Sequence, residues 1–317
     1  GLEDVDYLTN AEALSLQKIP ESLIVIGGRA LGLEFAQIYS HLGTRVVVLQ
    51  RSPRIIPDHE PEISEALRLS LVEEGIEIHT RVQVKRISRN ARGKIVEAAV
   101  DGKPMAFDGK HLLMATGRRP NTSGLGLENL GINFNGGASI QVNEHMQTSA
   151  DHVWAAGDVI GKPMLETTAA REGYVAASNA LEGSKLTIDY DSVPHAIFTS
   201  PQVASVGLNE EELSKRIEAC ACRTVPMSRV PKARAVKDTR GIIKMVIDPR
   251  TAVVAGVHIV SPHAAEIIHE ATLAVKHRLT IDDIIDTVHV FPTFSEAIKI
   301  AATAFRRDIT KMSCCIQ

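Results

Sequence analysis

Apolar residues near the start of the chain follow the pattern of a strand, a helix and a second strand. Residues 22–26 are almost continuously apolar, which predicts a buried strand that leads into Gly27 and Gly28. From residue 31 to residue 42 the apolar positions recur at helical spacing, and residues 45–49 predict another buried strand. A unit of this kind requires a parallel sheet with a right-handed crossover connection.

Later segments extend this pattern and indicate an α/β fold with a Rossmann-like βαβ unit at its start. Residues 121–150 are rich in glycine and polar residues and show no long period. Outside that stretch, we predict helices over residues 10–16, 62–74 and 168–181, and strands over residues 76–80, 82–90, 95–100, 111–115 and 151–156.

The pattern changes from residue 195 onward, where strands and helices no longer alternate regularly. We predict strands over residues 204–207, 220–225, 241–247 and 253–259, and helices over residues 210–217, 263–277, 281–287 and 295–304. Strands and helices grouped in this way favour an α+β domain, with an antiparallel sheet and helices on one side.

Composition narrows the class of protein. The chain has 317 residues, a formal net charge of −3, 44% hydrophobic residues and four cysteines. At roughly 100–200 residues per domain, this length predicts two or three domains. The hydrophobic fraction excludes a disordered chain, the near-neutral charge leaves no basic field for nucleic acid, and no apolar run approaches the roughly 20 residues of a membrane helix. We therefore expect a cytoplasmic protein that binds neither nucleic acid nor membrane, and four cysteines do not make a disulfide framework.

The turn after the first strand has the setting of a dinucleotide-binding fingerprint. Gly27 suits the tight turn and Gly32 suits close packing of the helix on the strand, while Gly28 lies between them and Arg29 takes the usual place of the second fingerprint glycine. The N-terminus of the following helix offers free N–H groups to a phosphate. The alternative is an ordinary strand-to-helix turn.

The end of the second strand bears on the choice between NADH and NADPH. An NAD site places an acidic residue about 20 residues after the fingerprint, whereas an NADP site places arginine there. Here the chain has Arg51, Ser52 and Arg54 and no acid. Arginine donates two parallel hydrogen bonds to a phosphate, so these residues favour NADPH; the alternative is a solvated charged loop.

Two further segments resemble the flavoprotein disulfide reductases that have two dinucleotide-binding domains. One is Thr116-Gly-Arg-Arg-Pro-Asn and the other is Val153-Trp-Ala-Ala-Gly-Asp158, and Thr199–Gly207 resembles the start of that family's dimerisation domain. The resemblance implies FAD and NADPH as cofactors. It places Asp158 on the ribityl chain of the flavin and puts Glu34 and Gly117 among the cofactor-binding residues.

The same resemblance implies a division of the chain. We expect an NAD(P)H-binding domain at residues 1–120, the C-terminal part of an FAD-binding domain at 121–190, a dimerisation domain at 191–309 that forms a homodimer, and a flexible cysteine tail at 310–317. The family's first FAD fingerprint and its Cys-x-x-x-x-Cys disulfide precede the NAD(P)H domain. No Cys-x-x-x-x-Cys occurs here, so we interpret the chain as the C-terminal two-thirds of a longer polypeptide.

The segment Val288–Glu296 departs from the family pattern. Most disulfide reductases carry a His-Pro-Thr sequence there, and its histidine is the general acid–base that keeps the exchanging thiol ionised. In this chain the histidine position is Phe291, which cannot move a proton. His289 lies two residues upstream, and Glu296 matches the glutamate that orients the family's histidine.

Within the family, the chain is most similar to the mercuric reductases. These end in two adjacent cysteines, as Cys314 and Cys315 nearly do here, and also lack histidine at the position of Phe291, where the better-known ones have tyrosine. They share a stretch matched by residues 230–233 and 238–244. The resemblance implies that Cys314 and Cys315, offered by a partner subunit, pass mercuric ion to the upstream dithiol for reduction to elemental mercury. Soft ions of this kind prefer thiolate ligands.

Other interpretations remain open. The chain fits a different disulfide reductase, such as a dihydrolipoamide dehydrogenase or a glutathione reductase-like enzyme, with His289 as the base. It also fits a non-catalytic module that binds NADP and dimerises. An alternative interpretation of Cys314 and Cys315 is an incidental or weakly oxidised pair. Cys220 and Cys222 are predicted to be buried small apolar residues, and they suit a metal ion only if their face of the strand is exposed.

Overall fold

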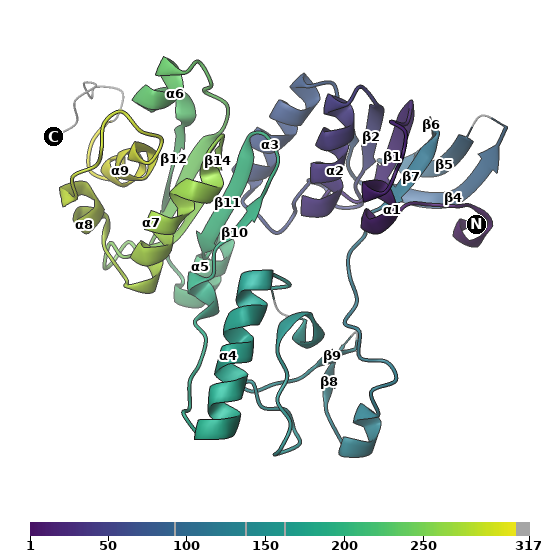
Figure 1. Cartoon of the computed structure of the whole chain (residues 1–317). Coiled ribbons are helices and arrows are strands. Elements are labelled where there is room, and N and C mark those ends of the chain that lie inside the picture. The colour runs from purple at the N-terminus through teal and green to yellow at the C-terminus, as the bar shows by residue number, and fades with distance from the viewer. Residues whose placement is uncertain (92, 137, 162, 309–317) are drawn as a thin grey trace. The chain divides into compact units, whose positions relative to one another are not determined.

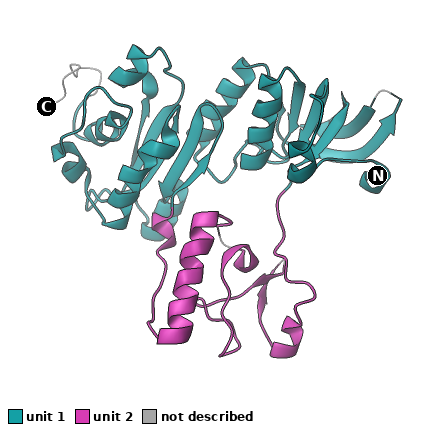
Figure 2. Ribbon diagram, viewed as in Figure 1, with its two compact units in different colours: residues 1–116, 194–317 teal, residues 117–193 magenta. Residues whose placement is uncertain are grey.

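The computed structural model describes residues 1–91, 93–136, 138–161 and 163–308. The chain forms two compact units (Figure 2): a larger unit of residues 1–116 and 194–317, and a smaller unit of residues 117–193. No helix among the described residues is long and apolar enough to span a membrane.

The first part of the larger unit is built on a four-stranded parallel sheet (Figure 1). The strand order is β3-β2-β1-β7, and the helices α2 (Ala30–His41) and α3 (Pro61–Glu73) connect its strands. The strands are β1 (Ser22–Ile26), β2 (Arg45–Leu49), β3 (Glu77–His79) and β7 (His111–Met114). This is the predicted Rossmann-like arrangement, and the short helix α1 (Asn10–Leu14) precedes it.

Both faces of the parallel sheet are covered, which explains why its strands are apolar throughout. Side chains alternate along a strand, so Leu23 and Val25 pack with α2 and α3 while Ile24 and Ile26 face the other way. The second face is covered by an antiparallel sheet of three strands, β4 (Val82–Asn90), β5 (Gly93–Val100) and β6 (Lys103–Gly109).

The second part of the larger unit is an antiparallel five-stranded sheet with the order β10-β11-β14-β13-β12. Its strands are β10 (His195–Ile197), β11 (Gln202–Gly207), β12 (Ala221–Pro226), β13 (Ile242–Ile247) and β14 (Val254–Ser261). Its helices are α5 (Glu210–Ile217), α6 (Pro231–Ala235), α7 (Ala264–Lys276), α8 (Ile281–Asp286) and α9 (Glu296–Thr303).

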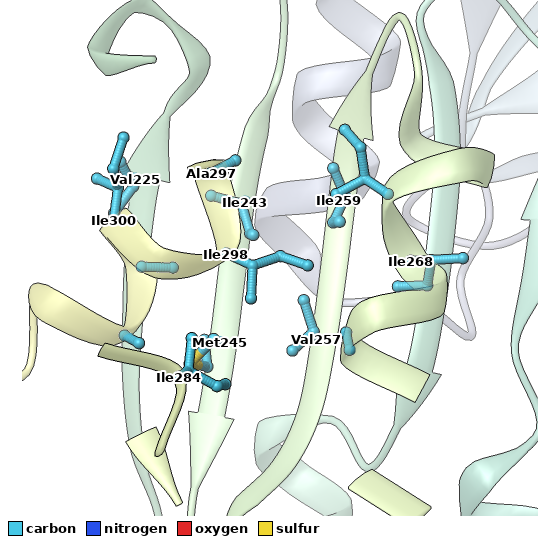
Figure 3. Close-up of a cluster of buried hydrophobic side chains, with 14 of the residues drawn as sticks. Val225, Ile243, Met245, Val257, Ile259, Ile268, Ile284, Ala297, Ile298 and Ile300 are labelled. Atoms are coloured by element: carbon cyan, nitrogen blue, oxygen red, sulfur yellow. The ribbon is translucent and has the colours of Figure 1, made fainter. Parts of the chain in front are cut away.

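One face of the five-stranded sheet carries a large apolar core. Figure 3 shows Ile243 and Val257 of the sheet packed with Ile268 of α7 and Ile298 of α9. The same core contains Met245 and the other labelled aliphatic side chains, all nearly or fully buried. The predicted antiparallel sheet is thus confirmed, but the expectation of helices on one side only is wrong, because α3 and α5 contact the opposite face through Lys244 of β13.

The smaller unit has little regular structure apart from one long helix, α4 (Glu166–Glu182). A short hairpin of β8 (Phe134–Asn135) and β9 (Ser139–Ile140) and the 3-10 turn Gly157–Ile160 pack near it. The predicted strand over residues 151–156 is wrong. Trp154 makes one isolated bridge with Gln147, and the apolar residues of this segment pack into the core of the unit without forming a ladder.

Candidate functional site

The turn after β1 has a backbone that only glycine tolerates at two positions. Gly27 has φ of +117°, and a Cβ there would lie 2.2 Å from the carbonyl oxygen of Ala115. A Cβ on Gly32 would lie 2.0 Å from the carbonyl oxygen of Gly27, so the first turn of α2 packs directly on the glycine turn. These are the steric demands expected of the first and third fingerprint glycines.

Arg29 and Gly28 complete this turn. Arg29 is the N-cap of α2, and its side chain makes no capping hydrogen bond but forms an ion pair with Asp58. The N–H of Gly28 donates to Oε1 of Gln50 over 2.9 Å. The first-turn N–H groups of α2 thus remain available to an anion, as in a phosphate-binding helix.

A cavity of about 490 Å³ opens at the carboxyl ends of β1, β2 and β7. Gly27, Arg29, Arg51 and Ser52 line it, which brings four of the sequence-predicted residues together. Arg54 does not line it, and its guanidinium donates to the carbonyl oxygen of Pro57 over 3.3 Å. Ligands of open α/β sheets bind at the carboxyl ends of the strands, so this cavity is the candidate dinucleotide site.

A larger cavity of about 620 Å³ lies at the opposite end of the parallel sheet. It is lined by residues at the amino ends of the strands, among them Ser22 and Arg45, and by none of the predicted site residues. Its position makes it a poor candidate for a dinucleotide.

Gln50 also lines the candidate cavity, and the sequence interpretation missed it. It is buried at the end of β2, where its Oε1 accepts from the N–H of Gly28 and its Nε2 donates to the carbonyl oxygen of Arg54 over 3.3 Å. One side chain thus joins the glycine turn to the loop that carries Arg51 and Ser52. A polar residue in the place of the usual acid was the only local signal.

Glu34 and Gly117 lie elsewhere. The Oε1 of Glu34 accepts from the N–H of Phe198 over 2.8 Å and so connects α2 to the segment after β10, and Glu34 is not among the residues that line the cavity. Gly117 is the first residue of the smaller unit and has φ of +123°. A role for either residue in cofactor binding stays a prediction.

Asp158 lies in the smaller unit on a turn that a buried carboxylate holds in place. Glu172 of α4 is 1% exposed, and its Oε2 accepts from the N–H of Gly157 over 2.7 Å while its Oε1 accepts from the hydroxyl of Tyr190 over 2.8 Å. Burial, followed by this hydrogen bond to Glu172, raises the pKa of Tyr190. Asp158 itself is partly exposed and accepts from Arg118 Nη1 over 3.0 Å, so its carboxylate is available to a polyol hydroxyl.

In the segment before α9, His289 and Glu296 bind different partners and do not form a pair. Phe291 is half exposed, and Glu296 accepts from the N–H of Thr293 over 3.1 Å. The side chain of His289 is 7% exposed, with Nδ1 3.0 Å from the carbonyl oxygen of Thr287 and Nε2 2.8 Å from Oε1 of Glu270. Both of its nitrogens thus have partners, and its carboxylate partner is Glu270 rather than Glu296; a role for His289 as the base stays a prediction.

The cysteines divide between described and undescribed parts of the chain. Cys314 and Cys315 lie outside the described residues. Cys220 and Cys222 are only partly buried, and both thiols donate to the carboxylate of Glu210. The prediction that they are buried apolar residues is therefore wrong, because a polar partner from α5 lies against them.

Two family models match the chain. Pyridine nucleotide-disulphide oxidoreductase matches residues 1–173, and its dimerisation domain matches residues 193–302. The chain belongs to the pyridine nucleotide-disulphide oxidoreductase family. Members of this family are oxidoreductases that use FAD and a pyridine nucleotide, in agreement with the resemblance inferred from residues 116–121 and 153–158.

The curated family members similar to this chain include mercuric reductases. That of Streptomyces lividans is 40% identical over 315 residues, which cover 99% of this chain and 66% of the relative, and that of Lysinibacillus sphaericus is 39% identical and is covered to 58%. Dihydrolipoyl dehydrogenase 2 of Arabidopsis thaliana is 37% identical over 96% of this chain and 60% of its own length. Thus the chain spans less than two-thirds of these relatives.

Solved structures of the family share this fold. LpdA from Mycobacterium tuberculosis superposes with a TM-score of 0.85 at 30% identity, covering 94% of this chain and 64% of that one. A copper(II) complex of the HOCl-induced flavoprotein disulfide reductase RclA from Escherichia coli superposes with a TM-score of 0.83 at 26% identity, covering 93% and 66%.

A row of polar side chains crosses the five-stranded sheet of this family member, one from each strand. The strand pairings place His195, Ser205, His258, Lys244 and Thr224 side by side in that order. We call these five residues the polar row. His258 and Lys244 are almost completely buried, and burial lowers the pKa of His258 to about 4.

The start of α3 packs on the polar row. His59 Nδ1 lies 3.2 Å from the hydroxyl of Ser205, and burial, together with the neighbouring His195, lowers the pKa of His59 to about 3. The ammonium of Lys244 lies within 3.1 Å of Glu60, 3.0 Å of Glu62 and 2.8 Å of Glu210. The part of the larger unit that is built on the parallel sheet is therefore attached to the five-stranded sheet by the buried charges of Lys244 and Glu60.

Residues 238–244 contribute to this attachment, which the sequence interpretation did not predict. Arg240 pairs with Asp238 and also reaches Glu74 at the end of α3 over 3.1 Å. A Cβ on Gly241 would lie 1.9 Å from the carbonyl oxygen of Val260. The stretch first noticed as a family resemblance thus holds α3 against the five-stranded sheet.

Proposed function

We propose that this chain is part of an enzyme that reduces mercuric ion to elemental mercury with electrons from NADPH. The observation that carries the proposal is the site before α9, where Phe291 takes the place of the family's histidine and His289 contacts Glu270 rather than Glu296. A disulfide reductase needs a proton-transferring group there, whereas adding two electrons to a metal ion needs none. The similarity to curated mercuric reductases supports the same substrate.

The proposed NADPH site is the cavity at the carboxyl end of the parallel sheet. Its residues fit the cofactor, because the N-terminus of α2 has no side-chain cap and can receive a phosphate, and Arg51 and Ser52 line the same cavity. Arg51 would pair with the 2′-phosphate, and Ser52 would add a hydroxyl donor. Arg54 would support the loop through Pro57.

The proposed contribution to FAD comes from Asp158 in the smaller unit. A partly exposed carboxylate on a turn of small residues fits a polyol such as the ribityl chain, and Glu172 fixes that turn by accepting from the N–H of Gly157. When bound, the nicotinamide and the flavin supply the two electrons that the reduction of mercuric ion requires. The residues of this chain bind and orient those groups.

We also propose a homodimer through residues 191–309 and a metal-capturing tail at residues 310–317. The match to the dimerisation-domain model supports the first part, as do the exposed apolar side chains of Val288, Val290 and Phe291. In the proposed division, residues 1–120 bind NADPH and residues 121–190 belong to the FAD-binding domain. Cys314 and Cys315 would hold the incoming mercuric ion as thiolates.

The test measures NADPH oxidation by the natural polypeptide that carries this chain, with mercuric ion and excess thiol, beside oxidised lipoamide and glutathione disulfide. We expect mercury-dependent turnover that greatly exceeds turnover of either disulfide. Turnover of a disulfide without release of mercury vapour would overturn the proposal. Under limiting thiol, the Cys314→Ala/Cys315→Ala variant should lose mercury turnover, and unchanged turnover would refute the role of the tail.

Two other functions are favoured by particular observations. The similarity to dihydrolipoyl dehydrogenase 2 favours an organic disulfide as substrate, which the lipoamide arm of the same assay tests. The cavity at the glycine turn and the match to the dimerisation-domain model favour a non-catalytic module that binds NADP and dimerises. That module would bind NADPH without flavin absorbance, so flavin that co-purifies with the 317-residue chain would contradict it.

A further inference from the structure

Two thiols of the five-stranded sheet converge on one carboxylate. Cys222 lies in the edge strand β12 and Cys220 lies just before it. The Sγ of Cys222 is 3.4 Å from Oε2 of Glu210, and the Sγ of Cys220 is 4.0 Å from Oε1 of the same residue. Because both thiols donate to one side chain of α5, they point into the same space.

The position of these thiols explains why they are not core residues. Side chains alternate across a strand, and Ala221 and Val225 pack with the apolar core under α9. Cys220 and Cys222 therefore lie on the opposite face, which is the face of Lys244 and α5. Both are partly exposed, so an ion in solution can reach them.

The surroundings of the thiols carry an excess of negative charge. Glu60, Glu62 and Glu210 surround the single ammonium of Lys244, which leaves two carboxylate charges uncompensated. Burial and the nearby Glu210 raise the pKa of Cys222 to about 11, so the thiols are protonated at neutral pH. Such a field opposes free thiolates but attracts a cation that binds sulfur.

We propose that Cys220 and Cys222 form a binding site for a soft, thiophilic metal ion such as mercuric ion, with the carboxylate of Glu210 beside it. Two S–metal bonds form while the two thiol protons leave to solvent, and no electrons are transferred. The pair provides two strong ligands, which suits an ion that binds two thiolates. Among the described residues no group of three or more His, Cys, Asp or Glu has the geometry of a metal site.

This site does not depend on the proposed reductase function, because it requires neither cofactor. Its test uses the full 317-residue chain with Cys314→Ala and Cys315→Ala, which leaves Cys220 and Cys222 as the remaining cysteines. The reduced protein is loaded with one equivalent of mercuric chloride and challenged with excess glutathione. Native mass spectrometry then counts the ions bound to the folded chain.

We expect one mercury atom per chain, with a mass increase that corresponds to mercury minus two protons. Adding Cys222→Ala should weaken retention against glutathione by roughly 10²-fold or more, because the second thiolate otherwise binds intramolecularly. Adding both Cys220→Ala and Cys222→Ala should abolish retention. The proposal is overturned if the tail variant loses its mercury as readily as the variant with a single cysteine, or if the variant without cysteines retains it.

Discussion

Replacing Lys244 by methionine removes the ammonium on which three carboxylates converge. Lys244 and Glu60 are 1% and 4% exposed, whereas Glu62 and Glu210 are 44% and 43% exposed. Methionine fills much the same volume, so the substitution tests the charge rather than the packing. The two exposed carboxylates can regain water in the variant, but Glu60 is left as a buried and unpaired charge.

Removing one partner of a buried ion pair costs about 3–5 kcal/mol, most of it from the stranded charge. Because only one of the three carboxylates stays buried, we expect Lys244→Met to lower the free energy of unfolding by about 3 kcal/mol, at the low end of that range. The double variant with Glu60→Gln should recover part of the loss, since the glutamine is neutral.

Urea denaturation followed by far-ultraviolet circular dichroism measures these differences. Lys215→Met is the matched control, because Lys215 pairs with Glu211 on the surface of α5. An exposed pair of this kind contributes about 0.2–1 kcal/mol. If Lys244→Met costs no more than Lys215→Met, the assignment of Lys244 as the buried anchor of α3 is wrong.

Three further predictions concern the cofactor turn and the polar row. The free energy of unfolding should fall as the pH drops from 6.5 toward 4. In that range His258 binds a proton in the unfolded chain, whereas burial keeps it neutral in the folded chain by lowering its pKa to about 4. His258→Gln should reduce that slope without abolishing it, because the pKa of buried His59 is lowered as well. The slope is measured by urea denaturation at several pH values, and an unchanged slope would contradict the reasoning. Arg51→Ala should raise the Kd for NADPH about tenfold or more with little change for NADH, since a charge-assisted hydrogen bond contributes about 1.5–3 kcal/mol. Arg54→Ala, the control outside the cavity, should have a smaller effect in the same fluorescence titration. Gln50→Ala should lower the free energy of unfolding by about 1–3 kcal/mol, because it leaves the buried N–H of Gly28 without an acceptor. An unchanged melting temperature and NADPH affinity would refute the role of Gln50.

Elements with a clear period were predicted accurately from the sequence. The strand over residues 45–49 and the helix over residues 210–217 have the predicted bounds, because their apolar spacing and flanking residues indicate both type and length. The strand Lys103–Gly109 was missed. Pro104 falls within it and most of its side chains are exposed, so it has little of the apolar pattern that identifies a strand.

The candidate site was predictable where its requirements are local. Gly27 and Gly32 stand at a spacing that follows from the turn itself, so one sequence segment suffices to predict them. Gln50 and Lys244 were missed because their partners lie far away along the chain, 22 residues in the case of Gly28 and 184 in the case of Glu60. Lysine in an apolar strand has the same appearance in a sequence whether its ammonium is paired or exposed.

The short segment at the start of α3 has a consequence for how this part of the chain can vary. Asp58 contacts Arg29 of the glycine turn, His59 contacts Ser205 of β11, and Glu60 contacts Lys244 of β13. Each of these three neighbouring residues thus contacts a different part of the fold: the glycine turn, β11 or β13. Insertion or deletion of a single residue here would misalign all three contacts at once, whereas a conservative substitution would disturb only one.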